Sequence, residues 1–160
     1  MNKIILAACL ALWTGCACAA ASPRFMSLKQ DQVNLRTGPG ERFPIIWVYA
    51  EKTYPVAVID EFELWRQIRE ADGTVGWVHK IMLSPARYAL ILEEDKLLKS
   101  PEPAAKITAI IQRGTTGRIL RCPADAPDYC QLQFKQGDIT VKGWFPRRNI
   151  WGLHGGEVID

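Results

Sequence analysis

A tryptophan with polar neighbours at alternate positions is the clearest candidate for binding chemistry in this 160-residue sequence. Trp65, Gln67 and Arg69 are spaced by two, so in a β-strand their side chains point to one face. An aromatic ring can cover part of an extended peptide, while adjacent polar groups fix the register of that peptide. Arg36, which precedes a glycine-rich loop, and Tyr49 complete the predicted ligand-binding set. A structural role is the alternative for Trp65, whose ring would then be covered by the other half of the chain or by two tyrosines, Tyr49 and Tyr54.

Catalytic chemistry has little support in the sequence. The two histidines, His79 and His154, have no neighbours at the spacing of metal ligands, and the paired carboxylates lie in turn-forming segments. A Cys/His hydrolase would need Cys130 as a free thiol beside His154. We therefore expect a protein that is not an enzyme, with no catalytic residue, metal or cofactor.

The first 21 residues resemble a secretory signal peptide. Lys3 precedes an apolar run, and small residues with Ala-x-Ala spacing end at Ala19 and Ala21. The alternatives are an uncleaved membrane anchor and lipidation of Cys16, the two cases in which we expect the chain to be held at a membrane. We thus expect a periplasmic or secreted protein, and the net charge of +3 is too small to predict nucleic-acid binding.

Export changes the interpretation of the cysteines. Beyond the leader only Cys122 and Cys130 remain, and an even pair in an oxidising compartment predicts a disulfide. The residues between them are turn-rich, which would allow two antiparallel strands to meet.

Short apolar runs with turn residues between them indicate an all-β fold. Strands are expected near residues 25–28, 33–36, 45–49 and 55–59, followed by a hairpin at Asp72-Gly73 and one helical turn within residues 79–83. A two-residue type I′ turn at Asp72-Gly73 would pair Ile68 with Trp77. Those two side chains, with Leu64 in line, would then form the core face of the hairpin.

The motifs in this order resemble the bacterial SH3-like domain. They are V-N-L-R-T-G-P-G at residues 33–40, L-W-R-Q-I at 64–68 and D-G-T-V-G-W-V at 72–78. The resemblance implies a five-stranded, strongly bent barrel in an exported or envelope protein, usually a binding or targeting module. It covers roughly residues 26–85, and we place the first domain at residues 25–85.

The second half repeats the first more faintly. Leu98 echoes Leu35 and Trp144 echoes Trp77, so the offset grows from 63 (98 − 35) to 67 (144 − 77), with the insertion expected in the cysteine-bridged loop or the 136–138 turn. We expect a divergent SH3-like domain with a disulfide at residues 86–152, a tail at 153–160, and two domains that pack together. Trp144 is expected in the core, and Trp151 either plugs the end of a domain or contacts a partner.

Exported bacterial proteins with two such units, the second carrying a cysteine pair and ending in Leu/Ile-Trp-Gly, resemble the chain throughout. The expected function is that of a non-enzymatic cell-envelope binding module that recognises peptidoglycan peptide stems or an envelope protein. The alternative is the targeting or regulatory part of a cell-wall hydrolase or amidase system.

Overall fold

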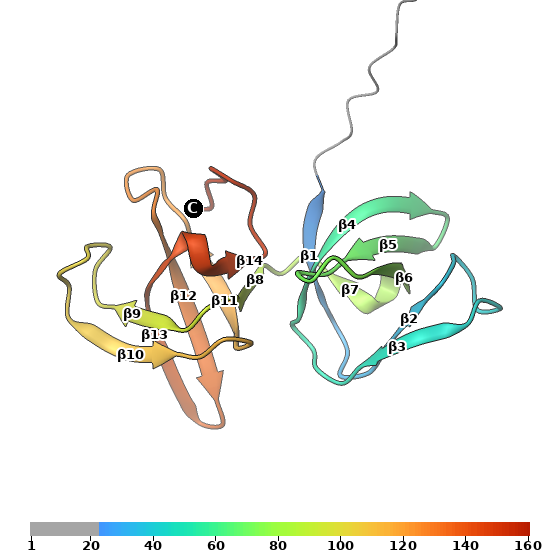
Figure 1. Cartoon of the computed structure of the whole chain (residues 1–160), viewed down its shortest axis with the longest axis horizontal. Coiled ribbons are helices and arrows are strands. Elements are labelled where there is room, and N and C mark those ends of the chain that lie inside the picture. Colours follow the sequence, from blue (N-terminus) through green and yellow to red (C-terminus); the bar gives the residue numbers. More distant parts are fainter. Residues whose placement is uncertain (1–22) are drawn as a thin grey trace, which may run out of the picture.

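The structure is a computed structural model that describes residues 23–160 as two β-domains (Figure 1). The predicted leader, including Cys16, lies outside the described residues. The first domain contains β1 (Arg24–Leu28), β2 (Val33–Arg36), β3 (Ile45–Tyr49), β4 (Pro55–Phe62), β5 (Trp65–Arg69), β6 (Val75–His79), the short 3-10 helix η1 (Lys80–Met82) and β7 (Leu83–Ser84).

The second domain repeats this series of elements. It contains β8 (Tyr88–Ile91), β9 (Asp95–Leu98), β10 (Ile107–Ile111), β11 (Thr116–Arg121), β12 (Tyr129–Gln136), β13 (Ile139–Pro146), the 3-10 helix η2 (Arg147–Asn149) and β14 (Ile150–Trp151). The strand orders are β3-β2-β6-β5-β4-β1-β7 and β10-β9-β13-β12-β11-β8-β14. The two orders are identical, because each strand number in the second domain is seven higher than that of its equivalent in the first. The all-β prediction of two tandem domains is confirmed. Each antiparallel sheet has seven strands, where the resemblance implied five, because the first and last strands of each domain add a pair at one edge.

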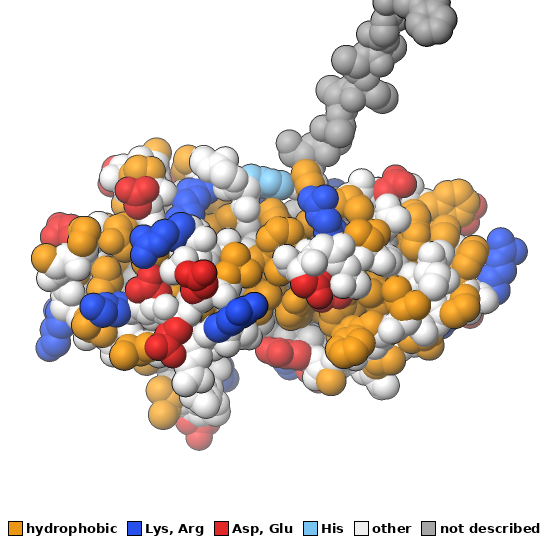
Figure 2. All heavy atoms as spheres, viewed as in Figure 1, with side chains coloured by type: hydrophobic (Ala, Val, Ile, Leu, Met, Phe, Trp, Pro, Cys, Tyr) orange, Lys and Arg blue, Asp and Glu red, His pale blue; other side chains and the backbone are white. Residues whose placement is uncertain are grey.

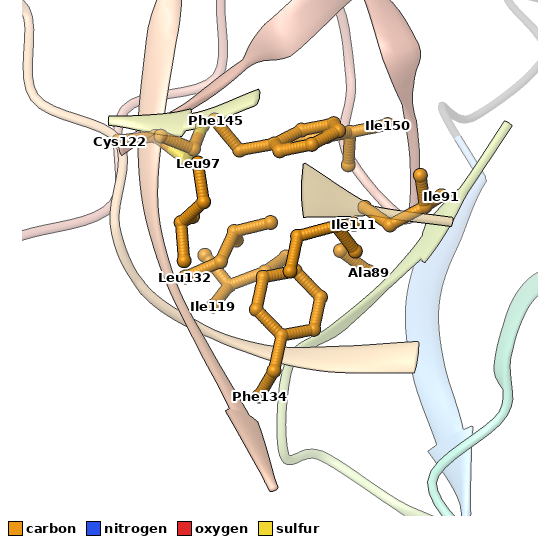
Figure 3. Packing of buried hydrophobic residues seen from close by; sticks show 11 residues of the cluster. Ala89, Ile91, Leu97, Ile111, Ile119, Cys122, Leu132, Phe134, Phe145 and Ile150 are labelled. Atoms are coloured by element: carbon orange, nitrogen blue, oxygen red, sulfur yellow. A yellow bond between two sulfur atoms is a disulfide. The ribbon is translucent and has the colours of Figure 1, made fainter. Parts of the chain in front are cut away.

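Each sheet bends around its own hydrophobic core. In the first domain the fully buried residues include Leu35, Val56, Ile68 and Val78. In the second, Phe145, Leu97 and Leu132 converge with the half-cystine Cys122 (Figure 3). Alternation is clearest along β2 and β12, where every second side chain faces the core.

Backbone pairing fixes which residues of the two domains are equivalent. A Cβ added at Gly76 would meet Leu35, and one added at Gly143 would meet Leu97. The equivalent of Leu35 is therefore Leu97 and the offset is 62 (97 − 35), one less than the sequence predicted. The equivalence of Trp77 and Trp144 is as predicted, because each lies cross-strand from a glutamine, Gln67 and Gln131.

Two insertions lengthen the second domain. Between the paired residues Asp60 and Gln67 lie six residues, and between Arg121 and Gln131 lie nine. Between Gln67 and Trp77 lie nine residues, and between Gln131 and Trp144 lie twelve. The extra residues therefore fall in both of the predicted places, the cysteine-bridged loop and the 136–138 turn.

The hairpin at Asp72-Gly73 differs from the prediction by one residue of register. Of its turn residues only Gly73 has positive φ, at 91°, and the Gly73 N–H donates to the Glu70 carbonyl oxygen (3.1 Å). The loop is thus a type I turn followed by a left-handed glycine. As a result Ile68 pairs with Gly76, and Trp77 lies on the outer face opposite the core.

Two further core predictions change with this register. Trp77 is half-buried on the outer face, and Leu64 is exposed in the β4–β5 turn after Glu63, a residue with positive φ. Trp144 is buried as predicted, yet it also faces away from the core, and its ring lies under the Arg121 guanidinium at 4.8 Å.

The two domains meet at Phe25 on β1. Its ring lies 5.1 Å from that of Trp151 and 4.9 Å from that of His154, and the Arg87 guanidinium lies 5.9 Å away. Elsewhere along the contact, Thr116 Oγ1 donates to Glu51 Oε1 (3.1 Å). Trp151 is therefore an interdomain contact, and the domains pack together as expected from their short connection.

Candidate functional site

A surface hollow of about 380 Å³ on the first domain contains two of the predicted binding residues, Trp65 and Arg36. Its other lining residues are Gln32, Asn34, Glu41, His79, Ile81 and Met82. We call it the Trp65 groove. It lies between the β2–β3 loop, the start of β5 and the 3-10 helix η1.

Strand pairing positions the aromatic wall of this groove. Trp65 begins β5 and pairs with His79, the last residue of β6, and their rings meet edge to face at 5.4 Å. His79 Nδ1 in turn accepts the N–H of Ile81 (3.4 Å), so the imidazole also caps η1. The half-buried Trp65 ring thus stands on a framework held by both the sheet and the helix.

Arg36 shapes the opposite wall. Its Nη1 donates to the carbonyl oxygens of Glu41 (3.0 Å) and Phe43 (2.8 Å), which folds the β2–β3 loop back over the end of β2. Within that loop a Cβ at Gly38 would lie 2.5 Å from the Phe43 ring. Gly38 is therefore needed for space under that ring, and Arg36 acts chiefly on the shape of the groove.

The other predicted residues lie apart from the groove. Gln67 pairs with Trp77 and Arg69 with Val75, farther along the same face of the sheet. Tyr49 is buried, and its hydroxyl donates to Glu70 Oε1 (2.6 Å). Tyr49 and Tyr54 stack at 5.8 Å on each other rather than on Trp65.

Comparison with known proteins gives the family of the first domain. The family profile described as "Bacterial SH3 domain" matches residues 29–85. Residues 29–85 form a bacterial SH3 domain. A search of the curated proteins gave no match.

Two solved structures match most of the chain at low similarity. "Structure of NlpC1 from Trichomonas vaginalis" is 11% identical with a TM-score of 0.36, over 89% of this chain and 50% of that one. "Structure of NlpC2 from Trichomonas vaginalis" is 12% identical with a TM-score of 0.36, over 81% of this chain and 48% of that one. The chain thus spans about half the length of these structures.

The second domain carries a hollow at the position equivalent to the groove of the bacterial SH3 domain. Its volume is about 750 Å³, and its walls include Pro103, Tyr129 and Arg148. Tyr129 pairs with Pro146 as Trp65 pairs with His79, so an aromatic ring begins the equivalent strand in both domains. The sequence repeat does not predict this second groove, because the wall that the C-terminal tail provides has no counterpart in the first domain.

Arginines hold that tail in place. Arg147 Nη2 donates to the carbonyl oxygens of His154 (2.8 Å) and Glu157 (2.6 Å). Arg87 forms a paired contact with the Glu157 carboxylate, at 2.6 and 3.0 Å, and donates to the Gly152 carbonyl oxygen (2.8 Å). Hydrogen bonding from Arg87 keeps the pKa of Glu157 below its ordinary value.

The tail also covers the disulfide. Cys122 and Cys130 are bonded, as predicted, and both are fully buried. The Cys122 N–H donates to the Ile159 carbonyl oxygen (2.6 Å) and Ile159 returns the bond (3.1 Å). A hydrolase that used Cys130 as its nucleophile is incompatible with this bond, and His154 packs instead on Phe25.

Within residues 23–160 no three His, Cys, Asp or Glu side chains gather in a way that could hold a metal ion. In the same part of the chain no helix is long and apolar enough to cross a bilayer. The described surface includes two open grooves at equivalent positions of the two domains, each lined by an aromatic ring and by polar side chains.

Proposed function

We propose that the chain is an exported, non-enzymatic binding protein of the cell envelope whose Trp65 groove holds an extended cell-wall peptide stem. The observation that carries this proposal is the groove itself, in which a half-buried indole lies between a hydrogen-bonding loop and a 3-10 helix. An extended ligand can lay an apolar side chain on the ring while its amides reach the polar rim. The buried disulfide supports an oxidising compartment.

The second domain would extend the binding surface. Tyr129 offers a smaller ring at the equivalent place, and Leu98 replaces the loop-shaping Arg36. We therefore assign the stronger site to the first domain. The Tyr129 groove is an auxiliary site that adds avidity when both grooves contact one polymer.

Sedimentation with purified peptidoglycan tests the proposal. The protein without its leader should pellet with the polymer, and Trp65→Ala should stay in the supernatant. Leu64→Ala is the matched control, because Leu64 is an exposed apolar neighbour outside the groove. Circular dichroism would show that all three proteins are folded.

Two results would contradict the proposal. One is a folded wild type that never pellets, which would direct the search to protein partners. The other is equal pelleting of wild type and Trp65→Ala, which would show that the groove is not the site.

A further inference from the structure

A second hollow on the first domain has a chemistry unlike that of the Trp65 groove. Its volume is about 490 Å³, and it lies beside the Asp72-Gly73 turn. Its walls are apolar and aromatic on one side and acidic on the other, formed by Ile46, Trp47, Tyr49, Tyr54, Glu70 and Asp72. We call it the Trp47 pocket.

Three aromatic rings form the first wall. Trp47 lies on the edge strand β3 and is 59% exposed, so its ring is available to a ligand. Tyr49 and Tyr54 stand beside it with ring centroids 5.8 Å apart and planes inclined by 35°. On the face of the molecule shown in Figure 2, hydrophobic side chains are common over the first domain.

Two carboxylates form the second wall. Asp72 Oδ1 accepts the Thr74 N–H (2.9 Å), and this hydrogen bonding lowers the pKa of Asp72. Glu70 is fixed by the Tyr49 hydroxyl at 2.6 Å. Burial, reinforced by Glu70, raises the pKa of Tyr54 to about 12, so its hydroxyl is neutral near pH 7.

The charges in the pocket are therefore of one sign. Among the described residues that line it, none is Lys, Arg or His. A cation placed there would meet the negative faces of aromatic rings and two carboxylates together. An anion would be repelled by both carboxylates.

The equivalent region of the second domain provides an internal contrast. The positions of Trp47 and Tyr49 are taken by Ala109 and Ile111, which pair with β9 as those residues pair with β2. Phe134 takes the position of Glu70, and Lys135 lines the hollow there. That hollow is lined by one ring, Phe134, and one carboxylate, Glu51 of the first domain, so it lacks the three rings and two carboxylates that meet in the Trp47 pocket.

We propose that the Trp47 pocket binds an organic cation, namely a primary or quaternary ammonium group carried on a short alkyl chain. The indole ring of Trp47 and the paired tyrosines enclose the alkyl part and the positive charge, and Glu70 and Asp72 supply the counter-charge. This site is separate from the Trp65 groove, and the proposal does not depend on peptidoglycan binding.

Titration of the 15N-labelled protein with small probes tests the pocket. N-acetyl-lysine methylamide carries the primary amine, choline carries the quaternary one, and N-acetyl-norleucine methylamide is the neutral control. The indole N–H resonance of Trp47, identified by its loss in Trp47→Ala, should shift with either cation and not with the norleucine probe. A response to one cation alone would identify which ammonium the pocket accepts.

Variants separate the charge from the rings. Glu70→Gln/Asp72→Asn keeps both hydrogen-bond acceptors and should weaken cation binding by about tenfold or more, since two close charges are lost. Trp47→Ala, followed through a Tyr54 resonance, should weaken it by about two- to fivefold. Trp65→Ala should bind the probes as wild type does, even where it abolishes pelleting with peptidoglycan.

The proposal is overturned if neither cation shifts the Trp47 resonance. It is also overturned if the norleucine probe binds as well as the lysine probe. Unchanged affinity in a folded Glu70→Gln/Asp72→Asn variant would contradict it in the same way.

Discussion

The two domains share one backbone plan and hold one cross-strand position by different chemistry. In the first domain Glu61 pairs with Arg66, and their side chains form a salt bridge of 3.2 Å. The equivalent positions of the second domain are Cys122 and Cys130, which form the disulfide. An ion pair between a half-exposed glutamate and a mostly buried arginine joins the strands where the β4–β5 turn is short, whereas a covalent bond joins them where three residues are inserted.

The β2–β3 loop and its equivalent, the β9–β10 loop, also share a backbone path while differing in side chains. In the first domain Gly38 and Gly40 leave space for the Phe43 ring. In the second, Ser100 and Glu102 take the glycine positions and Ala105 that of Phe43, yet the backbone hydrogen bonds are the same. The glycines of the Gly-Pro-Gly motif are therefore required by the ring above them and not by the path of the backbone.

The largest expected effect on stability comes from removing the disulfide, which tests the contrast between the disulfide and the ion pair. Cys122→Ala/Cys130→Ala should destabilise the second domain by about 2.5 kcal/mol, because the unfolded chain regains the freedom of the closed loop. Glu61→Ala should cost the first domain about 1 kcal/mol or less, since the Glu61 carboxylate is half exposed in its ion pairs with Arg66 and Arg24. Urea unfolding followed by hydrogen exchange would report each domain separately. Equal losses in the two variants would refute the contrast.

A smaller effect on stability is expected in the β2–β3 loop, where it tests whether Gly38 is required by the Phe43 ring. Gly38→Ala should destabilise the first domain by about 1–3 kcal/mol, because the added methyl meets the Phe43 ring. Adding Phe43→Ala should restore part of that loss, whereas Ser100→Ala should change the second domain by less than about 0.5 kcal/mol. Thermal unfolding checks all three. Failure of the second mutation to rescue the first would mean that Gly38 serves another purpose.

The smallest expected effect concerns the tail, which the first domain lacks. The pKa of Glu157 is lowered in the folded state by Arg87, so its contribution is present above the ordinary pKa of a glutamate and is lost as pH falls through the lowered value. Glu157→Gln should lower the free energy of unfolding by about 1 kcal/mol at neutral pH. Its stability should also fall less steeply than that of wild type as the pH is lowered. Glu102→Gln, an exposed control, should follow wild type when melting temperature is measured against pH.

The fold could be predicted because its signals are local. Alternating apolar residues mark β2, the Asp72-Gly73 turn marks the hairpin of β5 and β6, and residues 79–83 contain the single turn of η1. The register of the β5–β6 hairpin could not be predicted, because Asp72-Gly73 fits both a two-residue and a three-residue loop. That single step moved Trp77 from the predicted core to the outer face.

The candidate site could be predicted only in part, because it forms through contacts between segments that are distant in the sequence. Trp65 and Arg36 line one groove because the β2–β3 loop folds toward the start of β5, a long-range contact with no signal in spacing. Tyr49 belongs to the Trp47 pocket, which forms from three segments that are separate in sequence. The arginine contacts of the tail were equally hidden, since some join an arginine to a backbone carbonyl and the others join Arg87 to Glu157 across 70 residues of sequence.

Phe25 links the completion of the first domain's surface to residues of the second domain. It lies on the first strand, yet its ring is covered by Trp151 and His154, and Trp151 leaves the ribosome 126 residues (151 − 25) after Phe25 does. The first domain can form its own core early, but this aromatic side chain stays uncovered until both partners have been synthesised. Termination of synthesis before Trp151 would therefore leave an exposed apolar ring on an otherwise folded first domain.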